Sequence, residues 1–520
     1  MAMKKLVSAE YAASLIPDGA TLAIEGFVGS GFSEELAIAL EQRFLDTGAP
    51  TGLSLIYAAG IGDGQERGLN RLAHSGMLKR VTGGHWGLSP KLGKLAIDGE
   101  IEAYNLPQGT LAQLFRATAG HRPGVITHVG LKTFVDPRNG GGKMNDRTTE
   151  DIVSLMEIDG EEYLFYRTTP VNVAFIRGTV ADTRGNLALS KEALKLENLA
   201  IAQATRNSGG IVIAQVEKVA EFGSLRSWDV VVPGILVDYV VQSRPENHWQ
   251  TYGEPFNPAY AGSLRVPADS IAPIPLNERK IISRRAAMEL RDQAVVNLGI
   301  GMPEGVASVA AEEGVLDQVT LTVEPGPVGG IPAGGLAFGA ASNVEALMDQ
   351  PAQFDFYDGG GLDLAFLGLA QVDAMGNLNV SKFGPKFAGC GGFINITQNA
   401  KAVFYTGTFT AGGLKVAVED GVLRIHQEGK IRKFVKEVEH RTFSGEYALQ
   451  VGQPVLYITE RAVFELTDHG LMLTEIAPGI DVERDILAHM DFAPTVSANL
   501  KTMDPRIFGE DLMGLQLESR

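Results

Sequence analysis

The segment Val323-Glu324-Pro325-Gly326-Pro327-Val328-Gly329-Gly330 places a carboxylate where a strand ends and glycine-rich backbone begins. The residues before it, 318–323, are β-branched and apolar in the pattern of a buried strand. A large ligand can approach such backbone closely, and the strand end would hold Glu324 in a fixed direction. Glu324 is therefore either a surface residue of a turn or a fixed nucleophile, and the rest of the chain must distinguish the two.

The composition describes a folded protein of several domains. The chain has 520 residues, 45% of them apolar, and this length matches about three domains. A net charge of -17 argues against nucleic-acid binding, which needs a basic face. The single cysteine, Cys390, excludes an internal disulfide framework and indicates a reducing compartment. Because no apolar run suits a signal peptide or a membrane span, we expect a soluble cytoplasmic protein without a membrane partner.

The first part of the chain alternates strands and helices. Residues 21–24 form an apolar run that passes through the glycine turn 26–31 into a helix starting near Ser33. Further short strands are expected at 53–57, 79–82 and 103–106, with helical stretches between them. This alternation predicts an α/β fold with a mostly parallel sheet.

Two features interrupt that alternation. A hairpin is predicted from 153–158 and 163–166, and a helix from Ser190 to Asn207 and a strand at 211–216 follow it. Six prolines between positions 245 and 275 then exclude a helix or a central strand. We place a linker there.

The two sides of this linker repeat one another. Residues recur at one constant offset: Ala174-Phe175, Asp182, Gly185-Asn186-Leu187 and Ser190-Lys191 return as Ala365-Phe366, Asp373, Gly376-Asn377-Leu378 and Ser381-Lys382. We therefore predict a tandem pseudo-repeat of two related open α/β domains, 1–244 and 276–520, joined by the linker 245–275. Matching Val81-Thr82 with Val319-Thr320 places Trp86 opposite Glu324, so that only one half carries the carboxylate. A single active site is then expected at the interface between the halves.

Motifs for nucleotides and metals are weak or missing. The loop 26–31 has the spacing G-x-x-G-x-G, and it either only turns the chain or also binds an anionic ligand. The segment 140–144 lacks the spacing and the hydroxyl of a phosphate-binding P-loop. The histidines are dispersed and have no thiol partners, so no metal is expected. Cys390 has no basic neighbour in sequence and is predicted to be a small packed residue.

Two other features suit acyl chemistry. The backbone of Gly391 and Gly392 can expose amide groups that stabilise a developing oxyanion. Gln108 is either another such donor, from the first half, or simply the first residue of a helix after Pro107.

The residues named so far match a known family. Glu324-Pro325-Gly326 resembles the E-x-G motif, and 389–393 the G-x-G-G-F motif, of the family I coenzyme A transferases. The likeness covers essentially the whole chain, including 107–111, 140–143 and 475–479. Because both halves are fused in one chain and 357–363 matches as well, the sequence most resembles the propionate and acetate CoA-transferases.

The resemblance implies a ping-pong enzyme that moves CoA between a short-chain acyl-CoA, such as propionyl-CoA or acetyl-CoA, and a free short-chain carboxylate. Glu324 would attack the thioester and become a glutamyl-CoA thioester, which a second acid resolves. Gln108, Gly391 and Gly392 would polarise the carbonyls. The resemblance implies no metal and no tightly bound cofactor, since the CoA thioester is a substrate. The expected partners are small molecules and further copies of the chain in a homo-oligomer.

The substrate is expected to contact Gly29, Ser30, Gly326 and Gly389. Pro325 stands where propionate-type sequences carry serine, and it would stiffen the presentation of Glu324. Three alternatives stay open. Resolution of the intermediate by water would make an acyl-CoA hydrolase, and use of the loop 26–31 would make a nucleotide-binding oxidoreductase. The third is a non-catalytic ligand-binding protein with two lobes.

Overall fold

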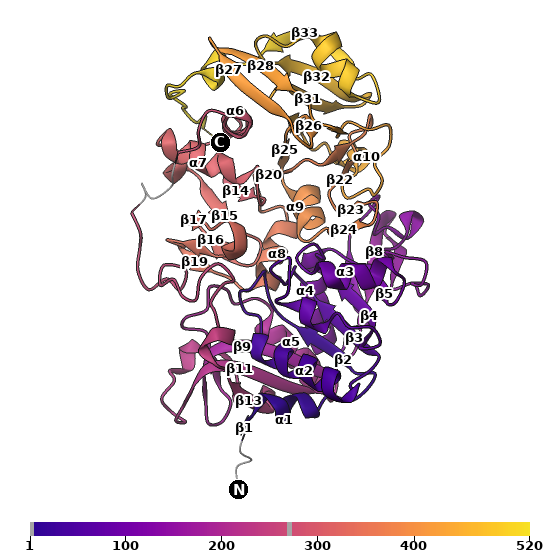
Figure 1. Cartoon of the computed structure of the whole chain (residues 1–520), viewed down its shortest axis with the longest axis vertical. Helices are drawn as coiled ribbons and strands as arrows, with labels where there is room; N and C mark the ends of the chain where they lie inside the picture. Colours follow the sequence, from indigo (N-terminus) through magenta and orange to yellow (C-terminus); the bar gives the residue numbers. More distant parts are fainter. Residues whose placement is uncertain (1–4, 268–272, 520) are drawn as a thin grey trace.

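The computed structural model describes residues 5–267 and 273–519 as two α/β halves stacked along the long axis of the molecule (Figure 1). The N-terminal half occupies the lower part of the view and the C-terminal half the upper part, with α4 (Gln108–Ala119), α8 (Gln350–Asp358) and α9 (Phe393–Asn399) near the junction. In the described chain no helix is both long enough and apolar enough to span a membrane.

A mostly parallel sheet forms the centre of the N-terminal half. Its main path runs β1-β13-β11-β9-β2-β3-β4-β5, and every neighbouring pair along this path is parallel. The strands are β1 (Leu6–Val7), β2 (Thr21–Ile24), β3 (Leu53–Tyr57), β4 (Leu78–Gly83), β5 (Glu102–Asn105), β9 (Val173–Asp182), β11 (Ile211–Ala220) and β13 (Tyr239–Gln242), with β10 (Leu187–Ala188) and β12 (Val230–Val232) beside β9. A separate antiparallel sheet holds β6 (Gly124–Thr127), β7 (Val153–Ile158) and β8 (Glu161–Arg167).

A second large sheet organises the C-terminal half, in the order β19-β16-β15-β14-β20-β25-β30-β31-β32-β33. Its central strands, β15 to β30 along this path, are parallel, and antiparallel pairs flank them. The strands are β14 (Val295–Leu298), β15 (Thr320–Thr322), β16 (Pro327–Val328), β19 (Ala346–Leu347), β20 (Leu364–Gly368), β25 (Ala402–Thr406), β30 (Val455–Ile458), β31 (Ala462–Thr467), β32 (Gly470–Ile476) and β33 (Thr495–Thr502).

The other helices are α1 (Ala9–Ser14), α2 (Glu34–Thr47), α3 (Pro90–Ile97), α5 (Asn198–Asn207), α6 (Glu278–Ala287), α7 (Glu304–Glu312) and α10 (Gly445–Gln450). Small two-stranded pairs complete the C-terminal half: β17 (Ile331–Pro332) with β18 (Ala341–Ser342), β21 (Gln371–Val372) with β22 (Leu378–Asn379), β23 (Lys382–Phe383) with β24 (Lys386–Phe387), β26 (Thr410–Ala411) with β29 (Ile431–Arg432), and β27 (Lys415–Glu419) with β28 (Val422–Gln427).

The predicted α/β class and the mostly parallel sheets are confirmed, and the predicted hairpin is β7–β8. One boundary was wrong. The helix expected from Ser190 begins only at Asn198, because the Glu192 side chain turns inward to pair with Arg177 at 3.1 Å and Leu196 has a positive φ of 49°. A buried ion pair and a left-handed residue thus replace the first turns of the expected helix.

The internal repeat has a visible physical basis. Asp182 accepts hydrogen bonds from the Asn186 backbone N–H at 3.0 Å and from its Nδ2 at 2.7 Å. In the other half, Asp373 accepts the same two bonds from Asn377, both at 3.0 Å. The matched sequence letters therefore encode one turn, closed by an aspartate, that is built twice.

The strand order corrects the match between Trp86 and Glu324. β2 and β14 each lie beside the repeat strand that carries Phe175 or Phe366, and β3 and β15 follow on their far sides. In this register β15 corresponds to β3, so Ala58 is the residue opposite Glu324. A Val-Thr pair occurs in many strands, and it was too little to set the register.

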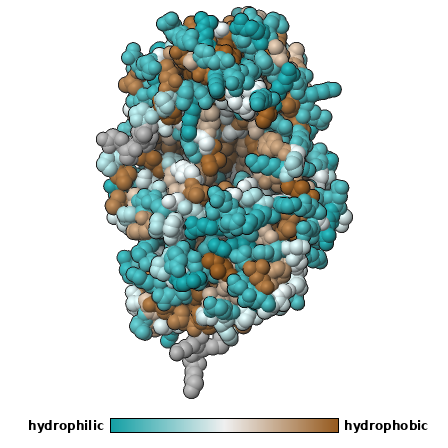
Figure 2. Space-filling view, in the orientation of Figure 1, coloured by the Kyte–Doolittle hydropathy of each residue, from teal (hydrophilic) through white to brown (hydrophobic). Residues whose placement is uncertain are grey.

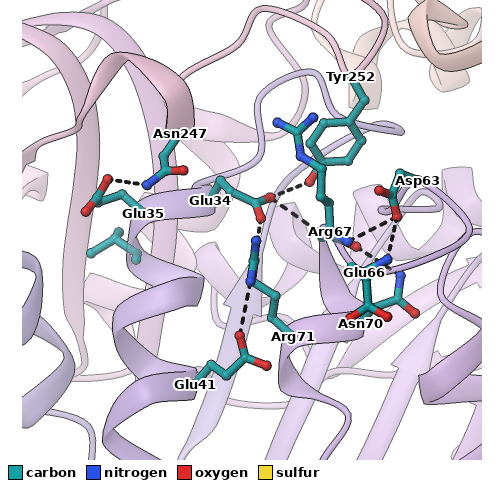
Figure 3. A network of polar contacts seen from close by, with 12 residues as sticks. Glu34, Glu35, Glu41, Asp63, Glu66, Arg67, Asn70, Arg71, Asn247 and Tyr252 are labelled. Carbon is teal, nitrogen blue, oxygen red and sulfur yellow. Dashed lines mark hydrogen bonds and ion pairs between the residues drawn. The ribbon is translucent and has the colours of Figure 1, made fainter.

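The segment proposed as a linker is fastened to the N-terminal half by a polar network (Figure 3). The Tyr252 hydroxyl donates to Glu34 Oε2 at 2.6 Å, and Glu34 also accepts from Arg71 Nε. The Arg67 guanidinium lies over the Tyr252 ring at 4.2 Å. The tyrosine is thereby fixed against the loop that precedes α2.

Candidate active site

A cavity of about 190 Å³ lies between the two halves. Figure 2 shows the surface hollowed between them, with hydrophobic residues inside the hollow. The lining of the cavity is mainly apolar and comes from both halves: Phe27, Val28, Gly60, His85, Leu88 and Gln108 from the first, and Asn297, Gly299, Ile300, Glu324, Gly335, Phe338, Leu367, Cys390, Gly391, Gly392, Phe393 and Ile396 from the second. The two catalytic motifs expected from the sequence therefore meet in one cavity.

Glu324 is held in the turn between β15 and β16. The turn is closed by the Val323 N–H, which donates to Pro327 O at 3.1 Å, and by the Gly326 N–H, which donates to Val323 O at 3.0 Å. Burial raises the pKa of the Glu324 carboxyl to about 7, against the opposing effect of a backbone hydrogen bond. Near neutral pH this group thus exists both as an acid and as a poorly solvated carboxylate, which suits a nucleophile.

A hydrogen-bonded group of buried side chains lies behind Glu324. The Tyr357 hydroxyl donates to Thr322 Oγ1 at 2.8 Å and accepts from Gln353 Nε2 at 3.0 Å and from Asn297 Nδ2 at 3.3 Å. Because Thr322 is the last residue of β15 and these bonds join it to α8 and β14, they fix the base from which the carboxylate projects.

The two glycines of the G-x-G-G-F segment differ in their hydrogen bonding. The Gly391 N–H donates to Gly84 O at 2.8 Å, so this amide is already engaged and the expectation of a free donor is wrong for it. The Gly392 N–H has no partner within the described chain, and a Cβ placed on Gly392 would lie 3.5 Å from Glu324 Cγ. Gly392 is thus the glycine with an amide left to serve the site.

Gln108 lies where the sequence placed it, as the first residue of α4 and on the cavity wall. Its backbone N–H donates to Gly391 O at 2.9 Å, which joins the helix start to the glycine segment across the two halves. Its side-chain Nε2 donates to Gln350 Oε1 at 3.2 Å. Both interpretations made from the sequence, helix start and cavity residue, are compatible with this position.

The four residues expected to contact substrate do not line the cavity. Gly29 packs beneath the Tyr252 ring, where a Cβ would come within 2.3 Å of it, and Ser30 is 1% exposed. A Cβ on Gly326 would meet Met348 O at 2.3 Å, and one on Gly389 would meet Gly84 O at 2.8 Å. The three glycines are closely approached by protein atoms, and sequence alone does not distinguish this from the approach of a ligand.

His85 is a cavity residue that the sequence argument passed over. Its ring packs beside Gly60, where a Cβ would lie 2.6 Å from Nδ1, and beside Gly87. Burial, assisted by the charge of Lys386, lowers the pKa of His85 to about 4, so the ring is neutral. It could have been found from its place just after β4, since ligands gather at the carboxyl ends of parallel strands.

Cys390 is a packed residue, as expected. It is 4% exposed, its thiol lies 3.5 Å from Leu106 O, and burial raises its pKa. The described residues contain no group of three or more His, Cys, Asp or Glu placed to hold a metal ion.

Comparison with known proteins agrees with this geometry. The family model described as Coenzyme A transferase matches residues 6–243. Caffeate CoA-transferase of Acetobacterium woodii is 48% identical over 519 residues, 99% of each chain. The chain belongs to the coenzyme A transferase family. Acetate CoA-transferase YdiF of Escherichia coli K12 is 46% identical over 514 residues, which cover 98% of this chain and 96% of that protein.

A solved structure supports the fold over the whole length. The apoenzyme of the acyl-CoA transferase YdiF from Escherichia coli O157:H7 superposes with a TM-score of 0.95 at 45% identity, covering 99% of this chain and 98% of that chain. The same YdiF has also been solved as a thioester complex with CoA, which superposes equally well. The present chain is accordingly a CoA-transferase with the fold of that family.

Proposed function

We propose that this CoA-transferase moves CoA between a short-chain acyl-CoA and a free short-chain carboxylate, with Glu324 as the covalent nucleophile. The observation that carries the proposal is the position of Glu324, a carboxylate of raised pKa on the wall of an apolar cavity. It lies beside Gly392, whose amide has no hydrogen-bond partner among the residues that the structure describes. The YdiF thioester complex with CoA supports a covalent route for the family member, and the proposal extends it to Glu324.

The chemistry balances without another reactant. A Glu324 carboxylate oxygen attacks the thioester carbonyl carbon, the C–S bond breaks, and CoA thiolate leaves a mixed anhydride on the glutamate. The thiolate then attacks the glutamyl carbonyl carbon and expels the acyl group as a free carboxylate, which leaves glutamyl-CoA. A second carboxylate attacks that thioester and the same steps run backwards, so the group-transfer potential of the thioester is conserved.

Each tetrahedral step places negative charge on a carbonyl oxygen. The Gly392 N–H would stabilise it, and the Gln108 side-chain amide would add a second donor when its nitrogen end faces the cavity, each worth roughly 3 kcal/mol when well aligned. The apolar wall, with Phe27, Phe338 and Phe393 among its members, excludes water that would hydrolyse the intermediates.

The size of the cavity favours small acids. Its volume of about 190 Å³ corresponds to roughly six water molecules, which is enough for a few acyl carbons. A larger aromatic acid, such as the substrate in the name of the Acetobacterium relative, would require the aromatic wall to move. Propionate and acetate are therefore the acids that we place first.

Intact-protein mass spectrometry after mixing with propionyl-CoA, with no acceptor present, tests the proposal. We expect a CoA adduct on the peptide that carries Glu324, discharged by added acetate with formation of acetyl-CoA. Glu324→Gln, which keeps the shape but not the nucleophile, is the matched control and should stay unmodified. CoA release that does not depend on an acceptor would instead identify a hydrolase.

The homo-oligomer and the cytoplasmic location stay predictions, and light scattering checks the first.

A further inference from the structure

We propose that Glu197 is a positioning residue which, acting through Gln350, decides which end of the Gln108 side-chain amide faces the cavity. The inference rests on the proposed function, because it concerns Gln108, a proposed hydrogen-bond donor to the substrate carbonyl in that site. It concerns a line of three side chains that begins at the cavity and ends at a buried carboxyl group.

The line crosses the interface between the halves twice. Gln108 Nε2 donates to Gln350 Oε1 at 3.2 Å, and Gln350 Nε2 donates to Glu197 Oε1. Gln108 and Gln350 are the first residues of α4 and α8, and Glu197 immediately precedes α5. Gln108 and Glu197 are 2% exposed and Gln350 is 0% exposed, so bulk water does not compete for these bonds.

The charge state of Glu197 sets the direction of this line. An ionised carboxylate can only accept, so Gln350 must turn its amine toward Glu197 and its oxygen toward Gln108. Gln108 then spends an N–H on Gln350, and its Oε1 points to the Gly391 side, 3.6 Å from where a Cβ on that glycine would lie. An acceptor there opposes the developing oxyanion.

A protonated Glu197 permits the reverse arrangement. Its hydroxyl donates to the oxygen of Gln350 after that amide has turned over, and the Gln350 amine then donates to Gln108 Oε1. The Gln108 amine consequently faces the cavity as a donor. Because the oxygen and nitrogen ends of an amide have nearly the same shape, the reversal needs no movement of the three helices.

The surroundings of Glu197 favour its neutral form. Burial raises the pKa of Glu197 to about 8, and the negative charge of Asp349 acts in the same direction. Burial raises the pKa of Glu25, another buried carboxyl group, and the charge of Glu197 adds to that rise. The cations on this side, Arg116 and Lys195, line a surface opening to which Glu197 also contributes, and Arg116 pairs with Asp355 at 2.8 Å. The second carboxylate oxygen, Oε2, has no hydrogen-bond partner within the described chain.

The proposal predicts an alkaline limit on catalysis. Since the folded-state pKa lies above the usual one, Glu197 keeps its proton below about pH 8, and the donor arrangement of Gln108 is lost as the pH rises through that value. The kcat of the full-length wild type, measured by transfer from propionyl-CoA to acetate, should fall above about pH 8 while KM changes little.

Two variants test the relay. Glu197→Gln offers both a donor and an acceptor and does not titrate, so it should retain most of the neutral-pH kcat and lose the alkaline limb. Gln350→Met interrupts the relay and should lower kcat by roughly 10- to 100-fold at neutral pH, with KM little changed. Gln203→Met, an exposed glutamine on α5, is the matched control and should leave both constants and the pH profile unchanged. Thermal unfolding of each variant confirms that it is folded.

The inference is overturned if folded Glu197→Gln keeps the alkaline limb, or if folded Gln350→Met keeps the wild-type kcat. The mass-spectrometric adduct separates this failure from failure of the proposed function. A wild type that forms the adduct at Glu324 with unchanged variants refutes only the relay, whereas a wild type without the adduct refutes the nucleophile.

Discussion

The two halves of the molecule share a turn and differ at the residue that matters for chemistry. Asp182 and Asp373 close the same turn through the same pair of bonds from the asparagine four residues later. At the ends of β3 and β15, however, one half carries Ala58 and the other Glu324. The residues that the two halves share therefore stabilise the fold, and the candidate active site lies where the two halves differ.

The difference continues into the strands next to these ends. Beyond β3 the N-terminal sheet extends in parallel through β4 and β5, whereas β15 is followed at once by the antiparallel β16. The tight turn that makes this reversal holds Glu324 at the cavity wall. The parallel continuation in the other half instead brings His85 to the same cavity from just beyond β4. The C-terminal half thus supplies the carboxylate, and the N-terminal half supplies part of the wall around it.

The largest effect on kcat should come from shortening Glu324, the residue at which the two halves differ. Glu324→Asp retains a carboxylate on the same turn but withdraws it by one methylene, so it can no longer reach the carbonyl in line. Because misplacement of a reacting atom by about 1 Å costs about 100-fold, we expect kcat to fall by at least that factor. Quenched-flow measurement of the CoA adduct formed from propionyl-CoA, without an acceptor, checks it. A rate close to wild type would show that the position of the carboxylate is not critical.

The next effect concerns the shared turn, and it should be equal in the two halves. Asp182→Ala and Asp373→Ala each leave an asparagine N–H and amide without their acceptor at sites where the aspartates are 3% and 4% exposed. We expect each to lower the free energy of unfolding by about 2 kcal/mol. Denaturant titration measures both, and matched losses support the repeat. A loss in one half only would mean that the two turns are not equivalent in energy.

The rate of adduct formation at acid pH reports on Glu324, the residue that has no counterpart in the N-terminal half. Burial raises the pKa of Glu324 from 4.5 to about 7, so the nucleophilic form declines as the pH falls below about 7. The rate of adduct formation should therefore drop about tenfold for each pH unit below that point. The same shift means that ionising Glu324 costs more in the folded than in the unfolded chain, which lowers stability as the pH rises from 4.5 toward 7. If the acid limb has the same midpoint pH in Glu324→Asp as in the wild type, the titration belongs to another group.

The sequence was sufficient for the strands whose composition and boundaries are local properties. Residues 21–24 and 53–57 were predicted as strands with the limits that β2 and β3 have, because apolar runs between turn residues specify them. It was also sufficient for the meeting of Glu324, Gln108 and Gly392, since the motifs identified the family. The division into 1–244, 245–275 and 276–520 stays a prediction, although the sheets lie on either side of it.

The features that could not be predicted from the sequence depend on contacts between segments that are far apart in the chain. No local signal shows that the Gly391 N–H is taken by Gly84, or that Tyr252 lies over Gly29, because each partner comes from another part of the chain. The pairing of Gln350 with Glu197 is equally invisible, since both glutamine and glutamate are ordinary residues at helix starts. Glycine in particular records a close approach without naming what approaches.

The smallest expected effect tests whether Ser30, in the glycine loop before α2, contacts the substrate or only packs within the protein. Ser30 is 1% exposed, and its hydroxyl has no hydrogen-bond partner within the described chain. Ser30→Ala removes a buried polar group that gains nothing from the fold, so stability should stay unchanged or rise by up to about 1 kcal/mol. Because Phe27 and Val28, rather than Ser30, line the cavity, KM and kcat for propionyl-CoA should match wild type. A marked rise in KM in a folded Ser30→Ala variant would restore this loop to the substrate site.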